Sequence, residues 1–152
     1  MSDYSQANSA SQSVFTASSA VNPAPESSEA SRELALTIAE AASDRKAGDI
    51  ILLRVAEVSY LADYFVMVTG YSRVQVRAIT QAIEDTVEIE WQRRPLRTEG
   101  KAEGSWVLQD YGEVMVHIMM PKEREFYNLE AFWGHAERTE FPSSGVDGGL
   151  AI

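Results

Sequence analysis

The sequence contains no cysteine among its 152 residues, which excludes disulfide bridges, thiolate zinc sites and cysteine nucleophiles. No apolar run approaches the roughly 18 to 20 residues that a membrane-spanning helix needs, so we expect no membrane partner. Histidine is also scarce: His117 and His135 are the only two, and neither has a carboxylate or histidine partner at the spacing of a metal site. The sequence therefore offers few groups for catalysis or metal binding.

Basic residues are outnumbered, with 13 Lys and Arg against 23 Asp and Glu, for a formal net charge of −10. All 13 basic residues and 19 of the acidic ones lie within 32–141, which gives that segment a net charge of −6. A groove that wraps nucleic acid needs clustered Lys and Arg to displace counterions. We therefore expect no direct sequence-specific nucleic-acid binding, and a basic protein as the more natural partner.

The two ends of the chain differ in composition from the middle. Residues 1–31 are rich in serine, contain no Lys or Arg, and show no helical or strand period, so we expect a disordered tail. Such a tail could be solubilising or a regulatory arm. Residues 142–152 are rich in Gly and Ser and are expected to be flexible, which leaves 32–141 as the folded domain. The start of the chain resembles neither a signal nor a transit peptide, so we expect a cytoplasmic location.

Periodicity predicts a helix, two strands and a longer helix in the first half of the domain. Ser31 is placed to cap the first helix, and residues 50–55 are typical of a strand. Residues 64–69 are apolar on both faces, which is typical of a strand in the middle of a covered sheet. Ser72 and Gln75 have the spacing of a capping box and begin the longest helix.

The second half predicts three strands and a last helix. A short strand is expected over 96–100, followed by an antiparallel hairpin of 105–110 and 113–119. Pro121 begins the last helix, whose apolar face is expected to hold Phe126, Leu129, Phe132 and Trp133. The order is α-β-β-α-β-β-β-α. It predicts an α/β fold, with a mixed sheet of about five strands and three helices packed on it.

The strand-to-helix junction Gly70–Ser72 is the one place where a phosphate could meet a helix N-terminus. Nucleotidyl transfer at such a site would need nearby carboxylates to bind divalent metal ions, yet residues 71–82 contain no Asp or Glu. The junction is therefore more naturally a helix cap. We expect no catalytic residues, no cofactor and no metal in this protein.

The segment 99–112 combines aromatic and acidic side chains and is a candidate anchor for a basic partner. It contains Glu103, Trp106, Asp110 and Tyr111. In the alternative interpretation Trp106 belongs to the core and Asp110 only begins a turn with Gly112. His117 shares a strand face with Met115 and Met119, where it is a hydrogen-bonded structural or interface residue, a partner contact or a catalytic group.

Several of these segments, in order, resemble the ribosomal silencing factor family (the Iojap-related proteins). The resemblance covers about residues 34–136. It rests on Ala62-Asp63-Tyr64-Phe65-Val66, Thr69-Gly70-Tyr71-Ser72, Gln75-Val76, Gly104-Ser105-Trp106-Val107-Leu108, Asp110-Tyr111-Gly112, Val116-His117, and Arg124-Glu125-Phe126-Tyr127-Asn128-Leu129-Glu130 with Trp133.

The resemblance implies a fold similar to nucleotidyltransferases but without that activity. It implies a protein that binds the large ribosomal subunit through ribosomal protein uL14, blocks docking of the small subunit, represses translation, and forms homodimers when free. Residue type and position then make Trp106, Asp110, Tyr111 and His117 the expected contacts, with Glu103 as a rim charge.

Two other functions remain open from the sequence. A nucleotide-binding enzyme would use the Gly70–Ser72 junction. A dimerisation module would use the apolar face of the strand that contains Met115 and Met119.

Overall fold

The computed structural model describes residues 25–56 and 62–142. Contacts divide the chain into a first unit, 1–30, and a second unit, 31–152, which contains the sheet. Of the first unit, only the opening residues of helix α2 are described. No helix of the described residues is long and apolar enough to cross a membrane.

The second unit is built on a six-stranded mixed sheet in the order β3-β4-β5-β2-β1-β6. Its central strands β2 and β5 are parallel, and the other neighbours are antiparallel. The strands are β1 (Gly48–Arg54), β2 (Tyr64–Thr69), β3 (Arg97–Glu99), β4 (Trp106–Asp110), β5 (Val114–Met119) and β6 (Glu137–Phe141). The α/β fold with a mixed sheet is therefore confirmed, with one strand more than expected.

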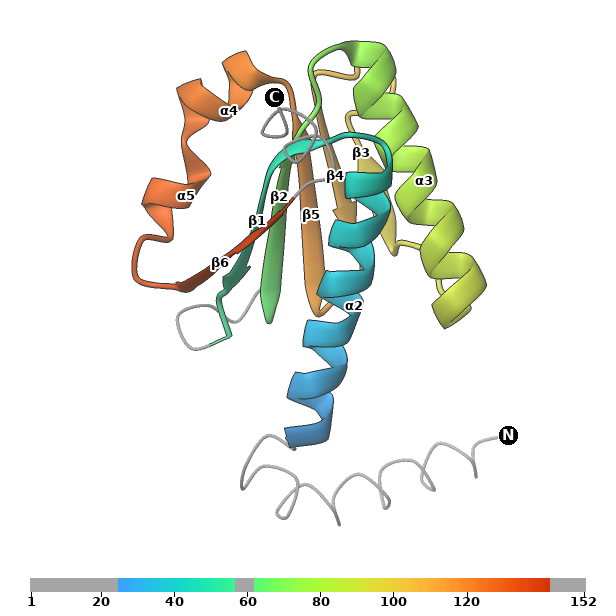
Figure 1. Cartoon of the computed structure of the whole chain (residues 1–152), viewed down its shortest axis with the longest axis vertical. Coiled ribbons are helices and arrows are strands. Elements are labelled where there is room, and N and C mark those ends of the chain that lie inside the picture. The colour runs from blue at the N-terminus through green and yellow to red at the C-terminus, as the bar shows by residue number, and fades with distance from the viewer. Residues whose placement is uncertain (1–24, 57–61, 143–152) are drawn as a thin grey trace, which may run out of the picture. The chain divides into compact units, whose positions relative to one another are not determined.

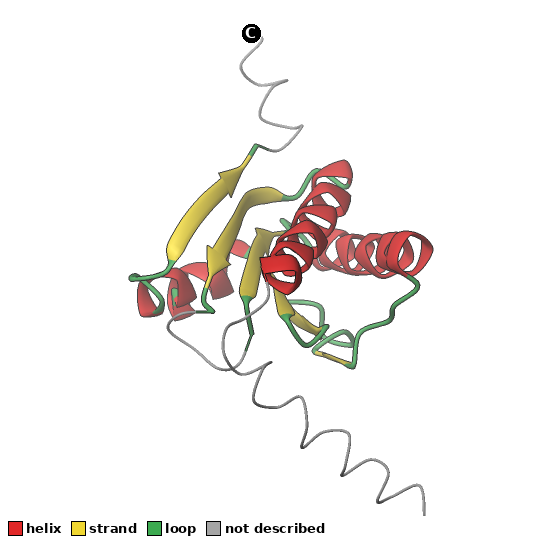
Figure 2. Cartoon of the chain, turned by 90° about the horizontal axis from the view of Figure 1, so that it is seen from below, coloured by secondary structure: helices red, strands yellow, loops and turns green. Residues whose placement is uncertain are grey.

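Two long helices cover one face of this sheet. Helices α2 (Pro25–Asp44) and α3 (Arg73–Trp91) lie on the same side of it (Figures 1 and 2). Their apolar stripes bury Leu34, Ile38, Ile79 and Ile83 against side chains that alternate along β2 and β5, such as Val66 and Val116. Since each buried aliphatic side chain contributes about 1.5–3 kcal/mol, this helix-covered face is the main core.

The second face carries only two short helices, α4 (Pro121–Tyr127) and α5 (Leu129–Phe132), on the opposite side from α2 and α3 (Figure 1). A smaller cluster forms beneath them from Leu53, Phe65, Met67 and Trp133. Every side chain of β2 is buried because both of its faces are covered, as the sequence predicted.

Three expectations need correction. Helix α2 begins at Pro25, so Ser31 lies inside it, where its hydroxyl donates to Asp63 at 2.7 Å instead of capping the helix. The expected tail, 1–31, is thus helical over its last residues, 25–31. Residues 1–24 lie outside the described part. Strand β6 was missed because its sequence, Glu137–Phe141, is almost wholly polar and exposed, as an edge strand can be.

The third correction concerns the last helix, which Asn128 divides into two. Asn128 adopts a left-handed conformation with φ of 45°, and its N–H bonds back to the carbonyl of Arg124. Phe126 and Phe132 point away from the core and are 77% and 76% exposed. Phe126 does so because Arg124, two positions earlier on α4, is buried and bonds Thr69 of the sheet.

The Ser72 cap is confirmed, although the Gln75 side chain bonds the N–H of Tyr71, one residue before the cap, and not that of Ser72 as in a strict capping box. The Ser72 hydroxyl accepts from the Gln75 N–H, and the Gln75 side-chain oxygen accepts from the Tyr71 N–H. The Gln75 amide also donates to the carbonyls of Arg45 and Lys46, which follow the end of α2. One side chain thereby joins the start of α3 to the end of α2.

We predict that Gln75→Ala lowers the free energy of unfolding by about 1–2 kcal/mol, because it leaves backbone groups at both helix ends without partners. Urea denaturation measures this. The matched control is Gln81→Ala on the same helix, whose amide bonds only Asp85, on the exposed surface. The control should change stability by less than about 0.5 kcal/mol. Equal effects of the two variants would contradict the joining role of Gln75.

Candidate functional site

The second face of the sheet is only partly covered where β4 meets β5. Strand β5 presents Met115 and His117 on this face, and β4 presents Trp106 and Leu108. All four are half-buried, whereas their neighbours in sequence, on the helix-covered face, are buried. The antiparallel register sets Leu108 opposite His117. We call these four residues, together with the aromatic side chains of α4, the open face.

Seven aromatic rings form a continuous chain across the second face. Successive centroids lie 4.9, 4.8, 6.0, 5.5, 5.3 and 5.2 Å apart. In order, the chain contains Phe126, Tyr127, Trp106, His117, Phe65, Trp133 and Phe132. Its middle is packed on the sheet, and its two ends are the most exposed rings in it. Exposed aromatic side chains beside packed ones are typical of a protein-binding surface.

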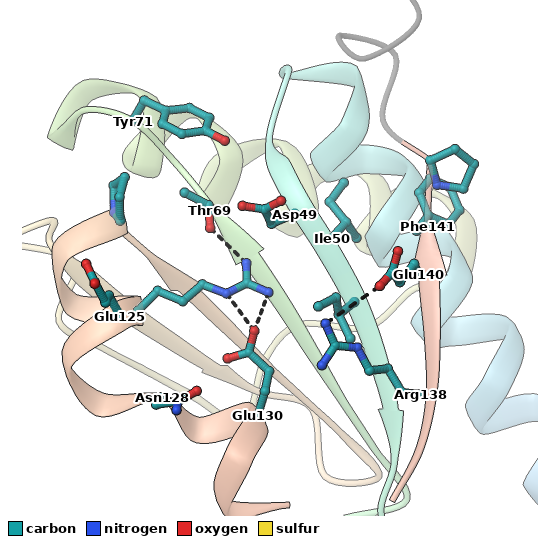
Figure 3. A pocket seen from close by; sticks show the side chains of 14 residues that line it. Asp49, Ile50, Thr69, Tyr71, Glu125, Asn128, Glu130, Arg138, Glu140 and Phe141 are labelled. Atoms are coloured by element: carbon teal, nitrogen blue, oxygen red, sulfur yellow. Dashed lines mark hydrogen bonds and ion pairs between the residues drawn. The ribbon is translucent and has the colours of Figure 1, made fainter. Parts of the chain in front are cut away.

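A buried arginine anchors the short helices that carry the outer rings. Arg124 is 8% exposed; it donates to the Thr69 hydroxyl at 2.8 Å and twice to the Glu130 carboxylate, at 2.9 and 2.7 Å. Figure 3 marks these bonds between the end of β2, where Thr69 lies, and Glu130 of α5. Because a buried charge is costly without partners, this network fixes α4 and α5 on the sheet.

A cavity of about 690 Å³ lies beside this anchor (Figure 3). Its lining includes Arg124 and Arg138, and each of these arginines pairs with a glutamate that also lines the cavity, Glu130 or Glu140. The described residues contain no group of three or more metal-ligating side chains. Both arginines of the cavity are thus already paired within the fold, while the carboxylates of Asp49 and Glu125 also line it.

The Gly70–Ser72 junction is occupied by its own side chains. The Tyr71 N–H and the Gln75 N–H, the donors that a phosphate would use, bond to Gln75 and Ser72 instead. The helix-cap interpretation is therefore confirmed. Three of the four carboxylates on α3 have local partners, because Glu84 pairs with Lys101, Glu88 with Arg94, and Asp85 accepts from Gln81.

Of the residues singled out from the sequence, Trp106 and His117 come together at the centre of the open face. The indole Nε1 of Trp106 donates to Nδ1 of His117 at 3.2 Å. Burial lowers the pKa of His117 to about 4, so the imidazole is neutral near pH 7. His117 is thus hydrogen-bonded within the fold, as the structural interpretation held, and it is half-buried; its contact with a partner stays a prediction.

Asp110 has a structural role, as the alternative interpretation held. Its carboxylate accepts from the Gly112 N–H at 2.8 Å, which forms the turn between β4 and β5, and it pairs with Arg97 at 3.3 Å. Asp110 nevertheless remains 19% exposed, at the edge of the open face. Glu103 is exposed in the turn before β4. Both remain candidate rim charges.

The contact expected for Tyr111 is wrong for this conformation, because the side chain is fully buried in the helix-covered core. Its hydroxyl has no hydrogen-bond partner among the described residues. Burial raises the pKa of Tyr111, with the nearby carboxylate of Glu84 as a second cause. Residue type alone gave no sign of this, because a place beside a turn does not fix the side of the sheet to which the ring points.

We predict that Tyr111→Phe leaves the free energy of unfolding unchanged or raises it by up to about 1 kcal/mol, since it removes an unpaired buried hydroxyl. Tyr111→Ala, in contrast, should lower it by about 3–5 kcal/mol through loss of the ring. Chemical denaturation of both variants checks this. A loss of more than about 1 kcal/mol in Tyr111→Phe would mean that the hydroxyl has a partner.

His117 predicts a second stability effect, which depends on pH. Its pKa of about 4 in the folded protein lies below its ordinary value of 6.5, so the unfolded chain binds more protons between these values. The contribution of His117 to the free energy of unfolding is therefore fully present above pH 6.5 and falls as the pH is lowered toward 4. Unfolding of the wild type and of His117→Asn should be followed from pH 7.5 to 4, and the variant should show the weaker pH dependence.

A parallel pH dependence in the two proteins would contradict that assignment. The Arg93–Glu113 ion pair provides an internal reference. A side-chain hydrogen bond from Arg93 lowers the pKa of Glu113 below its ordinary value of 4.5. The stability that Glu113 contributes is therefore lost at a lower pH than the stability that depends on His117. This loss should be equal in the wild type and in the variant.

Comparisons with known proteins give a consistent result. Residues 28–148 match the family model described as "Ribosomal silencing factor during starvation". The chain is 39% identical over 112 residues to the ribosomal silencing factor RsfS of Bacillus subtilis, covering 74% of this chain and 90% of that protein. It is 35% identical over 131 residues to the chloroplastic protein Iojap of Arabidopsis thaliana, covering 85% of this chain. The chain spans only about half (54%) of the length of that plant relative.

A solved structure agrees with the sequence matches. The crystal structure of a protein from Chromobacterium violaceum is similar with a TM-score of 0.66 at 34% identity, covering 74% of this chain and 89% of that one. The same fold is thus present in a relative of known structure.

Proposed function

The chain belongs to the ribosomal silencing factor family, whose members are non-enzymatic regulators that bind the ribosome, and we propose that its open face docks on the large ribosomal subunit. The observation that carries this proposal is the aromatic chain, whose exposed end at Phe126 continues into the half-buried Trp106 and His117. A surface of this kind supplies the few large anchors that dominate protein–protein affinity.

The partner in this proposal is ribosomal protein uL14, on the surface that the small subunit must reach. Occupancy of that surface represses translation by excluded volume, without any chemical step. The folded segment 32–141 carries a net charge of −6, which favours encounter with a basic ribosomal protein over contact with bare RNA. Asp110 and Glu103 are the rim charges, and Tyr111 is withdrawn from the contact set because it is buried.

Two further expectations from the sequence belong to this proposal. A homodimer of the free protein would use the same open face through Met115, although Met119 is buried and contributes nothing to it. Docking on the ribosome would then compete with dimer formation. A cytoplasmic location also remains a prediction, since the chain resembles both bacterial proteins and a chloroplastic one.

We predict that Phe126→Ala weakens binding to purified large subunits by about 30-fold, the effect of a 2 kcal/mol anchor. Phe126 is mostly exposed, so its removal should leave the fold intact, and co-sedimentation across a concentration series measures the affinity. The matched control is Ile89→Ala, whose side chain is 74% exposed on α3, on the other side of the sheet. Wild-type affinity in Phe126→Ala, or equal losses in both variants, would contradict docking through the open face.

A further inference from the structure

One polar interaction lies at the centre of the otherwise apolar open face. An indole N–H can only donate a hydrogen bond, so Nδ1 of His117 must be the acceptor in its 3.2 Å contact with Trp106. A neutral imidazole that accepts at Nδ1 carries its proton on Nε2. The contact with Trp106 therefore fixes the tautomer of His117.

The surroundings of His117 keep the imidazole neutral. In the sheet register Leu108 and Met67 lie opposite it, and the ring of Phe65 packs against it edge to face at 5.5 Å. Together with Trp106, these neighbours on β2 and β4 carry no charge. Burial lowers the pKa of His117 to about 4, and no charged neighbour contributes to that shift.

The proton on Nε2 has no acceptor among the described residues. The buried side-chain atoms that lack a partner there are Gln109 Oε1 and Tyr111 OH, both on the helix-covered side of β4 and the following turn, and Nε2 is not one of them. Nε2–H is thus an accessible donor in the middle of an aromatic surface. If a partner covers it without an acceptor, the cost of removing water from this donor opposes binding.

We propose that His117 sets the specificity of the open face through both ring nitrogens. Nδ1 positions the Trp106 indole, and Nε2–H selects a partner that places an oxygen acceptor over the centre of this surface. The inference rests on the proposed docking function and names the chemistry that the partner must supply there. An apolar partner surface of the same shape would be rejected, because it would bury the donor unpaired.

Two substitutions separate the two nitrogens. In His117→Asn the side-chain oxygen takes the place of Nδ1 and can hold the indole, but no donor remains at the place of Nε2. In His117→Gln the amide N–H₂ takes the place of Nε2, and the acceptor at Nδ1 is lost. His117→Leu removes both groups. Circular dichroism and thermal unfolding of each variant establish that it is folded.

The experiment measures the affinity of each variant for purified large subunits and, by NMR on the free proteins, the indole N–H resonance of Trp106. We expect His117→Asn to keep the hydrogen-bonded position of this resonance and to bind about tenfold more weakly. We expect His117→Gln to shift the resonance toward the position of a solvent-exposed indole. His117→Leu should show both changes. Wild-type affinity in His117→Asn would overturn the role of Nε2, and an unshifted indole in His117→Gln would overturn that of Nδ1.

A second measurement requires neither a variant nor a ribosome. Long-range ¹H–¹⁵N correlation spectra of the wild type near pH 7 report which ring nitrogen of His117 carries the proton. We expect Nε2, and protonation at Nδ1 would overturn the inference. Failure of the proposed function is distinct, because it would show as absent large-subunit binding by the wild type while the tautomer and the indole resonance remained as expected.

Discussion

The unequal covering of the two faces of the sheet is the constraint on which the rest of the structure depends. The central strands β2 and β5 bury apolar side chains on both faces, so each face needs a layer of helices. Two helices of 20 and 19 residues cover one face. The other receives helices of only 7 and 4 residues, which leaves its β4–β5 half partly open. The candidate surface exists because the second layer is too short to close it.

A charged network holds the short helices on the sheet, together with the smaller apolar cluster against which Leu129 and Trp133 pack. Arg124 joins the end of β2 to Glu130 across the break at Asn128, and Phe126, two positions after Arg124, lies on the outer side of α4. This network therefore stabilises the second layer, whose outer side carries the exposed aromatic side chains. The two faces of the sheet therefore have different roles. The helix-covered face contains the main core, and the other face presents the aromatic side chains proposed for binding.

The sequence predicted the structure correctly where a local pattern of residues has a single physical cause. The apolar run of β2, the Ser72 cap and the β4–β5 hairpin follow from local periodicity and turn chemistry, and the structure has all three. Strand β6 could not be predicted, because an exposed edge strand has no apolar alternation to detect. The burial of Tyr111 and the exposure of Phe126 depend on tertiary packing, and the break in the last helix depends on the left-handed Asn128. None of these features leaves a periodic signal in the sequence.

The central claim is that this chain acts on the large subunit by occupying a surface and not by catalysis. Its most direct test is sedimentation of purified small and large ribosomal subunits under joining conditions, with and without the protein. The account predicts separate subunits, with the protein co-sedimenting with the large one. Normal joining, with the protein left at the top of the gradient, would contradict it.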